Sequence, residues 1–167
     1  MNCIYSLYKY RLLHVVYLVF MKKIYFDVCS LCRPFDDQNF IRIRLETDAV
    51  NLILSKVKQN YYQLMKSKVH VIEINSISDD LERIELLELL NNYGKSLNVD
   101  PNKIKLRIEE LLLYNFGIAD AAHIAISEFY KSTFISCDDK LLNKCQKHIN
   151  LIKCVNPLTF CEMENLK

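Results

Sequence analysis

The chain has 167 residues, of which 51% are hydrophobic and 25% charged; this composition is typical of one folded domain and excludes a largely disordered chain. Its net charge of +2 is too small to indicate a nucleic-acid partner by itself. Only two glycines occur, Gly94 and Gly117, so the glycine-rich loops of ATP- and NAD-binding proteins are excluded, and neither HExxH nor GxSxG is present.

The first twenty residues form neither a convincing membrane anchor nor a signal peptide. The apolar run over residues 12–20 is interrupted by His14 and is shorter than the ~20 residues that span a bilayer. The small residues that precede a signal cleavage site are missing. We expect Met21 to be the native start, residues 1–20 to be an N-terminal extension, and residues 21–167 to form one domain without membrane association.

Apolar periodicity and turn residues predict the elements in chain order. Strands are expected over residues 24–26, 62–66, 97–99, 133–135 and 151–155, and helices over 37–59, 69–75, 78–92, 101–116, 118–129 and 140–147. The helix over 37–59 depends on an apolar stripe of Leu45, Ala49, Leu52 and Ile53. Strands that alternate with helices indicate a three-layer α/β/α domain with a central, mostly parallel sheet.

The cysteines indicate a reducing environment. Their number, seven, is odd and they are scattered, which does not suit a secreted disulfide framework, so we expect a cytoplasmic protein. Cys29 and Cys32 have the CxxC spacing of a redox pair or of half a zinc site. Because Arg33 and Pro34 follow and no second CxxC exists, we interpret both as packed residues in a loop. A thiol-disulfide oxidoreductase is the remote alternative.

Four acids lie where a parallel sheet binds its ligands, outside the carboxyl ends of the strands. Asp27 follows the first strand, Glu73 lies on the short helix after the second, Asp120 is in the first turn of its helix, and Asp138 follows the strand over 133–135. Taken singly, Asp120 and Asp138 could be helix caps. Several carboxylates at one edge repel one another unless a cation neutralises them, and oxygen ligands suit Mg²⁺ or Mn²⁺. The residues therefore indicate a metal-dependent nuclease.

Five segments together resemble the successive blocks of PIN-domain ribonucleases, particularly the small bacterial VapC-like toxins. They are IYFDVCSLCRPFDDQ at residues 24–38, then VIEINSISD, GIADAAHIA, FISCDDKLL and VNPLTF. The resemblance covers residues 21 to about 162. It implies a PIN-like fold, an RNA substrate, a homodimer, and an antitoxin that buries the acidic pocket with a basic side chain.

The resemblance assigns the family's four acidic positions to Asp27, Glu73, Asp120 and Asp138. It implies that Asp27, Asp120 and Asp138 hold Mg²⁺ or Mn²⁺, while Glu73 assists the metal or orients the attacking water. Ser136 matches a serine or threonine that supports the site, and Asp139 is a possible substitute for Asp138. The alternative to an enzyme is a catalytically degenerate PIN-like module that binds RNA or a protein.

One position departs from the family pattern. The residue after the first acid is commonly threonine or serine, and here it is Val28, so a supporting hydrogen bond is either missing or supplied by Ser30. Glu46 is a rival for the second acidic position. Its place in the middle of a helix, among other charged residues, favours a solvated surface role instead.

Arg33 is the candidate for substrate binding, because it closely follows Asp27 and arginine grips phosphate oxygens with two donors. The alternative is an ion pair with Asp36 or Asp37. Other basic residues either form an approach for RNA or are solvated helix charges; these are Arg42, Arg44, Lys56, Lys58, Lys66 and Lys68.

Overall fold

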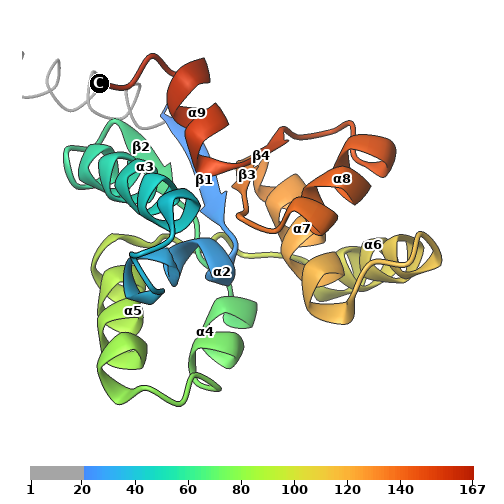
Figure 1. Ribbon diagram of the computed structural model, residues 1–167. Helices are drawn as coiled ribbons and strands as arrows, with labels where there is room; N and C mark the ends of the chain where they lie inside the picture. Colours follow the sequence, from blue (N-terminus) through green and yellow to red (C-terminus); the bar gives the residue numbers. More distant parts are fainter. Residues whose placement is uncertain (1–20) are drawn as a thin grey trace, which may run out of the picture.

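The computed structural model describes residues 21–167, so the expected extension over residues 1–20 lies outside the described residues, and the expected native start at Met21 stays a prediction. Its elements are β1 (Lys22–Phe26), α2 (Val28–Leu31), η1 (Arg33–Phe35), α3 (Ile41–Lys58), β2 (Tyr62–Leu64), α4 (Lys68–Ile74), α5 (Asp80–Tyr93), α6 (Pro101–Leu113), α7 (Ile118–Tyr130), β3 (Thr133–Ile135), α8 (Asp139–His148), β4 (Cys154–Val155) and α9 (Pro157–Met163) (Figure 1). No helix within this part of the chain is long and apolar enough to cross a membrane.

The central sheet has four strands, all parallel, in the order β2-β1-β3-β4. After β1 the chain forms β2 on one side of β1, and it later forms β3 on the other side of β1. The carboxyl ends of β1 and β3 therefore form the switch point of the sheet, where parallel α/β folds bind their ligands. Phe26 is aligned with Ile135, so Asp27 and Ser136 emerge side by side from this edge.

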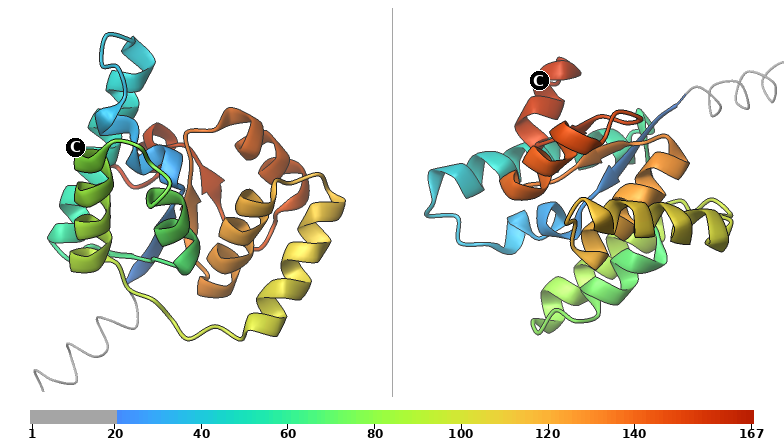
Figure 2. Two further views of the ribbon diagram at one scale, coloured as in Figure 1. Left: turned by 90° about the horizontal axis from the view of Figure 1, so that it is seen from below. Right: turned by 90° about the vertical axis from the view of Figure 1, so that its right-hand side faces the viewer.

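Helices cover both faces of the sheet, which gives three layers (Figure 1). Side chains of β1 alternate between them, as the two-residue period of a strand requires. Ile24 and Phe26 pack in a cluster with residues of α3, α5 and α9, whereas Tyr25 packs on the opposite face with residues of α6, α7 and α8. Figure 2 shows α4 between α5 and α7, beyond the end of β1. This position brings α4 to the switch point.

Several predicted elements have different bounds. Residues 97–99 are not a strand, because the extended pairing ends at a single bridge between Met65 and Lys95. The last strand is confined to Cys154–Val155. Helix α6 ends at Leu113, and Asn115 follows with a left-handed φ of 61°, a conformation that stops helices.

The segment after β1 is more regular than predicted. The interpretation of Cys29 as a loop residue is wrong, because it lies in the short helix α2, and Arg33 then opens the 3-10 helix η1. The thiols of Cys29 and Cys32 both have a raised pKa, mainly because they are buried. A redox cysteine needs a lowered pKa, so the oxidoreductase alternative has no support here.

Candidate metal centre

Asp27 is held at the end of β1 by both backbone and side-chain hydrogen bonds. Its backbone N–H donates to the Ile135 carbonyl at 2.8 Å, which continues the pairing of β1 with β3. Its Oδ2 accepts from the Ser136 hydroxyl at 2.7 Å and from the Cys29 thiol at 3.0 Å. Only 9% of the residue is exposed. These bonds fix one carboxylate oxygen, and the Ser136 hydroxyl lies where the resemblance placed a supporting group.

Ser30 does not hydrogen-bond to the Asp27 carboxylate. Its hydroxyl faces the Ile135 carbonyl and the Cys137 sulfur, each at 3.4 Å. Val28, the position that departs from the family pattern, packs in the hydrophobic core. The hydrogen bonds that support Asp27 therefore come from Ser136 and Cys29.

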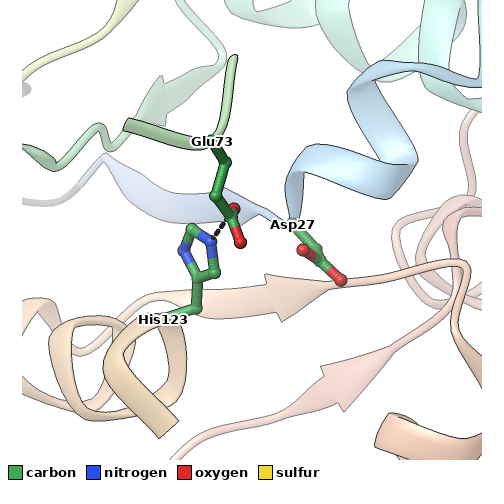
Figure 3. A group of neighbouring side chains, drawn as sticks. All are labelled: Asp27, Glu73 and His123. Atoms are coloured by element: carbon green, nitrogen blue, oxygen red, sulfur yellow. Dashed lines mark hydrogen bonds and ion pairs between the residues drawn. The ribbon is translucent and has the colours of Figure 1, made fainter. Parts of the chain in front are cut away.

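Glu73 and His123 complete a compact group with Asp27 (Figure 3). One candidate ligand atom from each residue lies within 4.8 Å of the other two. Glu73 Oε2 is 2.5 Å from His123 Nε2, and the histidine is only 1% exposed. Two carboxylates and an imidazole at this spacing are a donor set that could hold a divalent metal ion.

Asp120 and Asp138 are outside this group of three but share its electrostatic environment. Burial raises the pKa of Asp120, and the charges of Asp27 and Asp138 raise it further. Asp120 lies in the first turn of α7, and a backbone hydrogen bond from Gly117 opposes the rise in its pKa. A β-carbon on Gly117 would lie 3.0 Å from Asp120 Oδ2, so glycine permits this close approach.

Asp138 is also the N-cap of α8. Its Oδ1 accepts from the backbone N–H groups of Lys140 and Leu141 at 2.7 and 3.1 Å. This is the capping role that the sequence left open. Asp139 is exposed and forms a two-pronged ion pair with Arg42, whose hydrogen bonds lower the pKa of Asp139. Its role as a substitute for Asp138 stays a prediction, and Arg42 would have to release it.

The expectation that Glu46 is a solvated surface residue is wrong. Glu46 is 2% exposed and accepts from Arg33 Nε at 2.6 Å and Arg42 Nε at 2.8 Å. Arg33 also pairs with Asp36 at 2.6 Å, the alternative considered from the sequence. Contact of Arg33 with a substrate phosphate stays a prediction, because Arg33 would first have to release Asp36 or Glu46.

The neighbouring Leu45, expected in the buried stripe of α3, is 47% exposed, because Glu46 and Ala49 face inward.

Sequence reasoning did not identify His123 as a site residue. It lies three positions after Asp120 in GIADAAHIA, which places both side chains on one side of α7. His70 has the same spacing from Glu73 on α4 and was also missed. The available signal was a histidine about one helical turn from Asp120 and another from Glu73.

Comparisons with known proteins support the fold. No family model matches the sequence, and no curated protein matches it. The structure is similar to the crystal structure of FitAcB from Neisseria gonorrhoeae, with a TM-score of 0.50 and 15% sequence identity, over 81% of this chain and 98% of that chain. At this identity the likeness shows the fold alone, and the predicted three-layer, PIN-like α/β/α fold class is confirmed.

Replacing Asp120 by asparagine is expected to stabilise the metal-free protein at neutral pH. An acid whose pKa is raised by folding favours the folded state at low pH, and that contribution is lost as the pH rises through the folded-state pKa. At pH 7 the ionised carboxylate is therefore unfavourable, and asparagine removes its charge. Solvent screening of this half-exposed group keeps the gain below about 1 kcal/mol.

Urea denaturation with a chelator at pH 7 and pH 4 measures this effect. The difference in free energy of unfolding between Asp120→Asn and the parent protein should become smaller as the pH falls. A variant that is less stable than the parent at pH 7 would contradict the raised pKa.

Proposed function

We propose that this protein is a metal-dependent ribonuclease of the PIN family, related to VapC-like toxins. The main support is the convergence of Asp27, Glu73 and His123 at the switch point of a parallel sheet, with Asp120 and Asp138 acting on the same electrostatic environment. These five residues come from four separate segments of the chain, which local helix capping does not require.

The aspartates of the proposed site suit a divalent cation. Asp27, Asp120 and Asp138 would hold Mg²⁺ or Mn²⁺, because carboxylate oxygens suit hard cations. Burial raises the pKa of Asp120, and the repulsion from Asp27 and Asp138 that raises it further would be relieved by the cation. When bound, such an ion would lower the pKa of a water molecule and neutralise charge on the phosphodiester.

The protein's own groups position the carboxylates, the attacking water and the substrate. The Ser136 hydroxyl and the Cys29 thiol hold one oxygen of Asp27. In the metal-free protein His123 holds Glu73 Oε2 and keeps this carboxylate beside Asp27, where Glu73 would orient the attacking water. Arg33 would bind the substrate phosphate once released from Asp36 or Glu46.

Partners follow from the same proposal. The substrate is RNA, and the protein acts as the toxin of a toxin-antitoxin pair in the cytoplasm and as a homodimer. An antitoxin would neutralise it by placing a basic side chain against the carboxylates of Asp27 and Asp120, which a cation would otherwise occupy.

Calorimetric titration of the full chain with Mn²⁺ tests the proposed site. We expect binding to the parent protein and loss of binding in Asp27→Asn and in Asp120→Asn. Asp48→Asn is the matched control, since Asp48 is exposed on α3, away from the end of β1. Absence of binding to the parent at millimolar Mn²⁺ would contradict the proposed site and favour a degenerate module that binds RNA or a protein.

A further inference from the structure

A buried chain of hydrogen bonds, which we name the relay, leads from His123 into the protein. Its members are Tyr25, Ser67 and His70, and each of them is at most 8% exposed. The Tyr25 hydroxyl lies 2.7 Å from His123 Nδ1 and 2.7 Å from Ser67 Oγ. His70 Nδ1 accepts from the Ser67 backbone N–H at 3.1 Å. The relay therefore connects His123 to α4, the helix that carries Glu73.

The far end of the relay has a fixed polarity. His70 Nε2 lies 2.7 Å from the Phe26 carbonyl, which can only accept, so this nitrogen carries the proton. Burial lowers the pKa of His70 to about 3, so the ring is neutral and its Nδ1 is an acceptor. Whatever happens at His123, the relay ends at a group that accepts a hydrogen bond.

Two directions of hydrogen bonding are possible along the relay, and only the first keeps the bond between His123 and Glu73. In the first, His123 Nε2–H donates to Glu73, Tyr25 donates to His123 Nδ1, and Ser67 donates to Tyr25. In the second, His123 Nδ1–H donates to Tyr25, Tyr25 donates to Ser67, and Ser67 Oγ donates to His70 Nδ1, 3.3 Å away. The second direction leaves His123 Nε2 without a proton.

We propose that the relay lets His123 exchange its Nε2–H tautomer for the Nδ1–H tautomer, so that Nε2 binds a divalent cation beside Asp27 and Glu73. This inference rests on the proposed function, because it assigns a further ligand to the same site. The exchange conserves protons: water takes one from Nε2 and returns one to Nδ1, while the hydroxyls of Tyr25 and Ser67 reorient.

The chemical consequence is a change in metal preference. Carboxylate oxygens alone suit Mg²⁺, whereas an imidazole nitrogen raises the affinity for transition metals and zinc. A metal-bound histidine commonly donates its other ring N–H to a fixed acceptor, and here Tyr25 provides one. The site is therefore expected to prefer Mn²⁺ or Zn²⁺ to Mg²⁺.

Nitrogen NMR of the full chain, labelled with ¹⁵N-histidine, tests the proposal directly with Zn²⁺ as a diamagnetic probe. Without metal, His123 should show the Nε2–H tautomer. With Zn²⁺, it should show a metal-bound Nε2 and a protonated Nδ1, while His70 keeps its tautomer and is the internal reference. Zn²⁺ binding with His123 still protonated at Nε2 would overturn this inference and leave the proposed metal site intact. Absence of Zn²⁺ binding would overturn both.

Tyr25→Phe and Tyr130→Phe form a matched pair of variants. Each removes a tyrosine hydroxyl that has two hydrogen-bond partners, but only that of Tyr25 contacts His123. Tyr25→Phe should weaken Zn²⁺ binding roughly 10-fold or more, because the Nδ1–H tautomer loses its acceptor. Tyr130→Phe should leave the affinity unchanged. Equal losses in both variants would show a general structural effect and overturn the inference.

Discussion

Cleavage of RNA by the Asp27→Asn variant is expected to be at least about 10³-fold slower than cleavage by the parent protein, equivalent to about 4 kcal/mol of transition-state stabilisation. The substitution keeps the shape of the side chain but removes the negative charge at the centre of the proposed site. Asp27 is the residue that links the group containing Glu73 and His123 to the environment of Asp120. Single-turnover cleavage at an Mn²⁺ concentration that saturates the parent protein measures the effect.

The fold of the Asp27→Asn variant should persist, which separates a catalytic loss from unfolding. The Ser136 hydroxyl and the Cys29 thiol can still donate to an amide oxygen, and the backbone bond to Ile135 is unaffected. Asp48→Asn, on the exposed surface of α3, should cleave at the parent rate. Cleavage by the parent that survives a chelator, or that Asp27→Asn leaves intact, would contradict the proposed function.

The features that the sequence predicted well depend on local pattern and on topology. Asp27 and Ser136 each follow a short apolar run, and parallel strands end at the same edge of a sheet. The register between Phe26 and Ile135 then brings the two side chains into contact. Glu73 was located by its place on a helix after the second strand. The ends of the strands define these positions.

The features that the sequence missed depend on contacts between distant segments. Tyr25 and His123 are 98 positions apart, and a tyrosine within an apolar strand is indistinguishable from a core aromatic until its hydroxyl is located. His123 lies within the helical segment GIADAAHIA, whose apolar pattern does not distinguish a histidine with polar partners from one packed in the core. The hydrogen bond to Glu73 exists only because α4 and α7 meet at the end of β1.

Glu46 illustrates the same limit for a charged residue. Its neighbours along α3 favour solvent, and only the fold brings Arg33 of η1 to it. The paired arginines make burial of this carboxylate tolerable. The inward turn of Glu46 also explains why Leu45, one position earlier, is exposed. A periodicity argument based on apolar residues alone could not find a buried face that contains an acid.

Glu46→Ala is expected to lower the free energy of unfolding by about 3 kcal/mol, because it leaves two arginines without a buried partner. For a protein of this size that corresponds to a fall in Tm of roughly 6 to 12 °C. The loss should lie at the low end of the range for broken buried pairs, since Arg33 keeps Asp36 and Arg42 keeps Asp139. Thermal denaturation followed by circular dichroism measures it.

Asp36→Ala is the control for Glu46→Ala, because it removes a more exposed partner of the same arginine and should cost less than about 1 kcal/mol. Equal effects of the two substitutions would mean that burial of Glu46 adds nothing to the strength of the pair. The double variant Glu46→Ala/Arg33→Ala isolates the pairing itself. The double variant removes one of the two arginines that Glu46→Ala leaves without a buried partner, so it should be less destabilised than the sum of the single variants, by an amount that reports the coupling of Glu46 with Arg33.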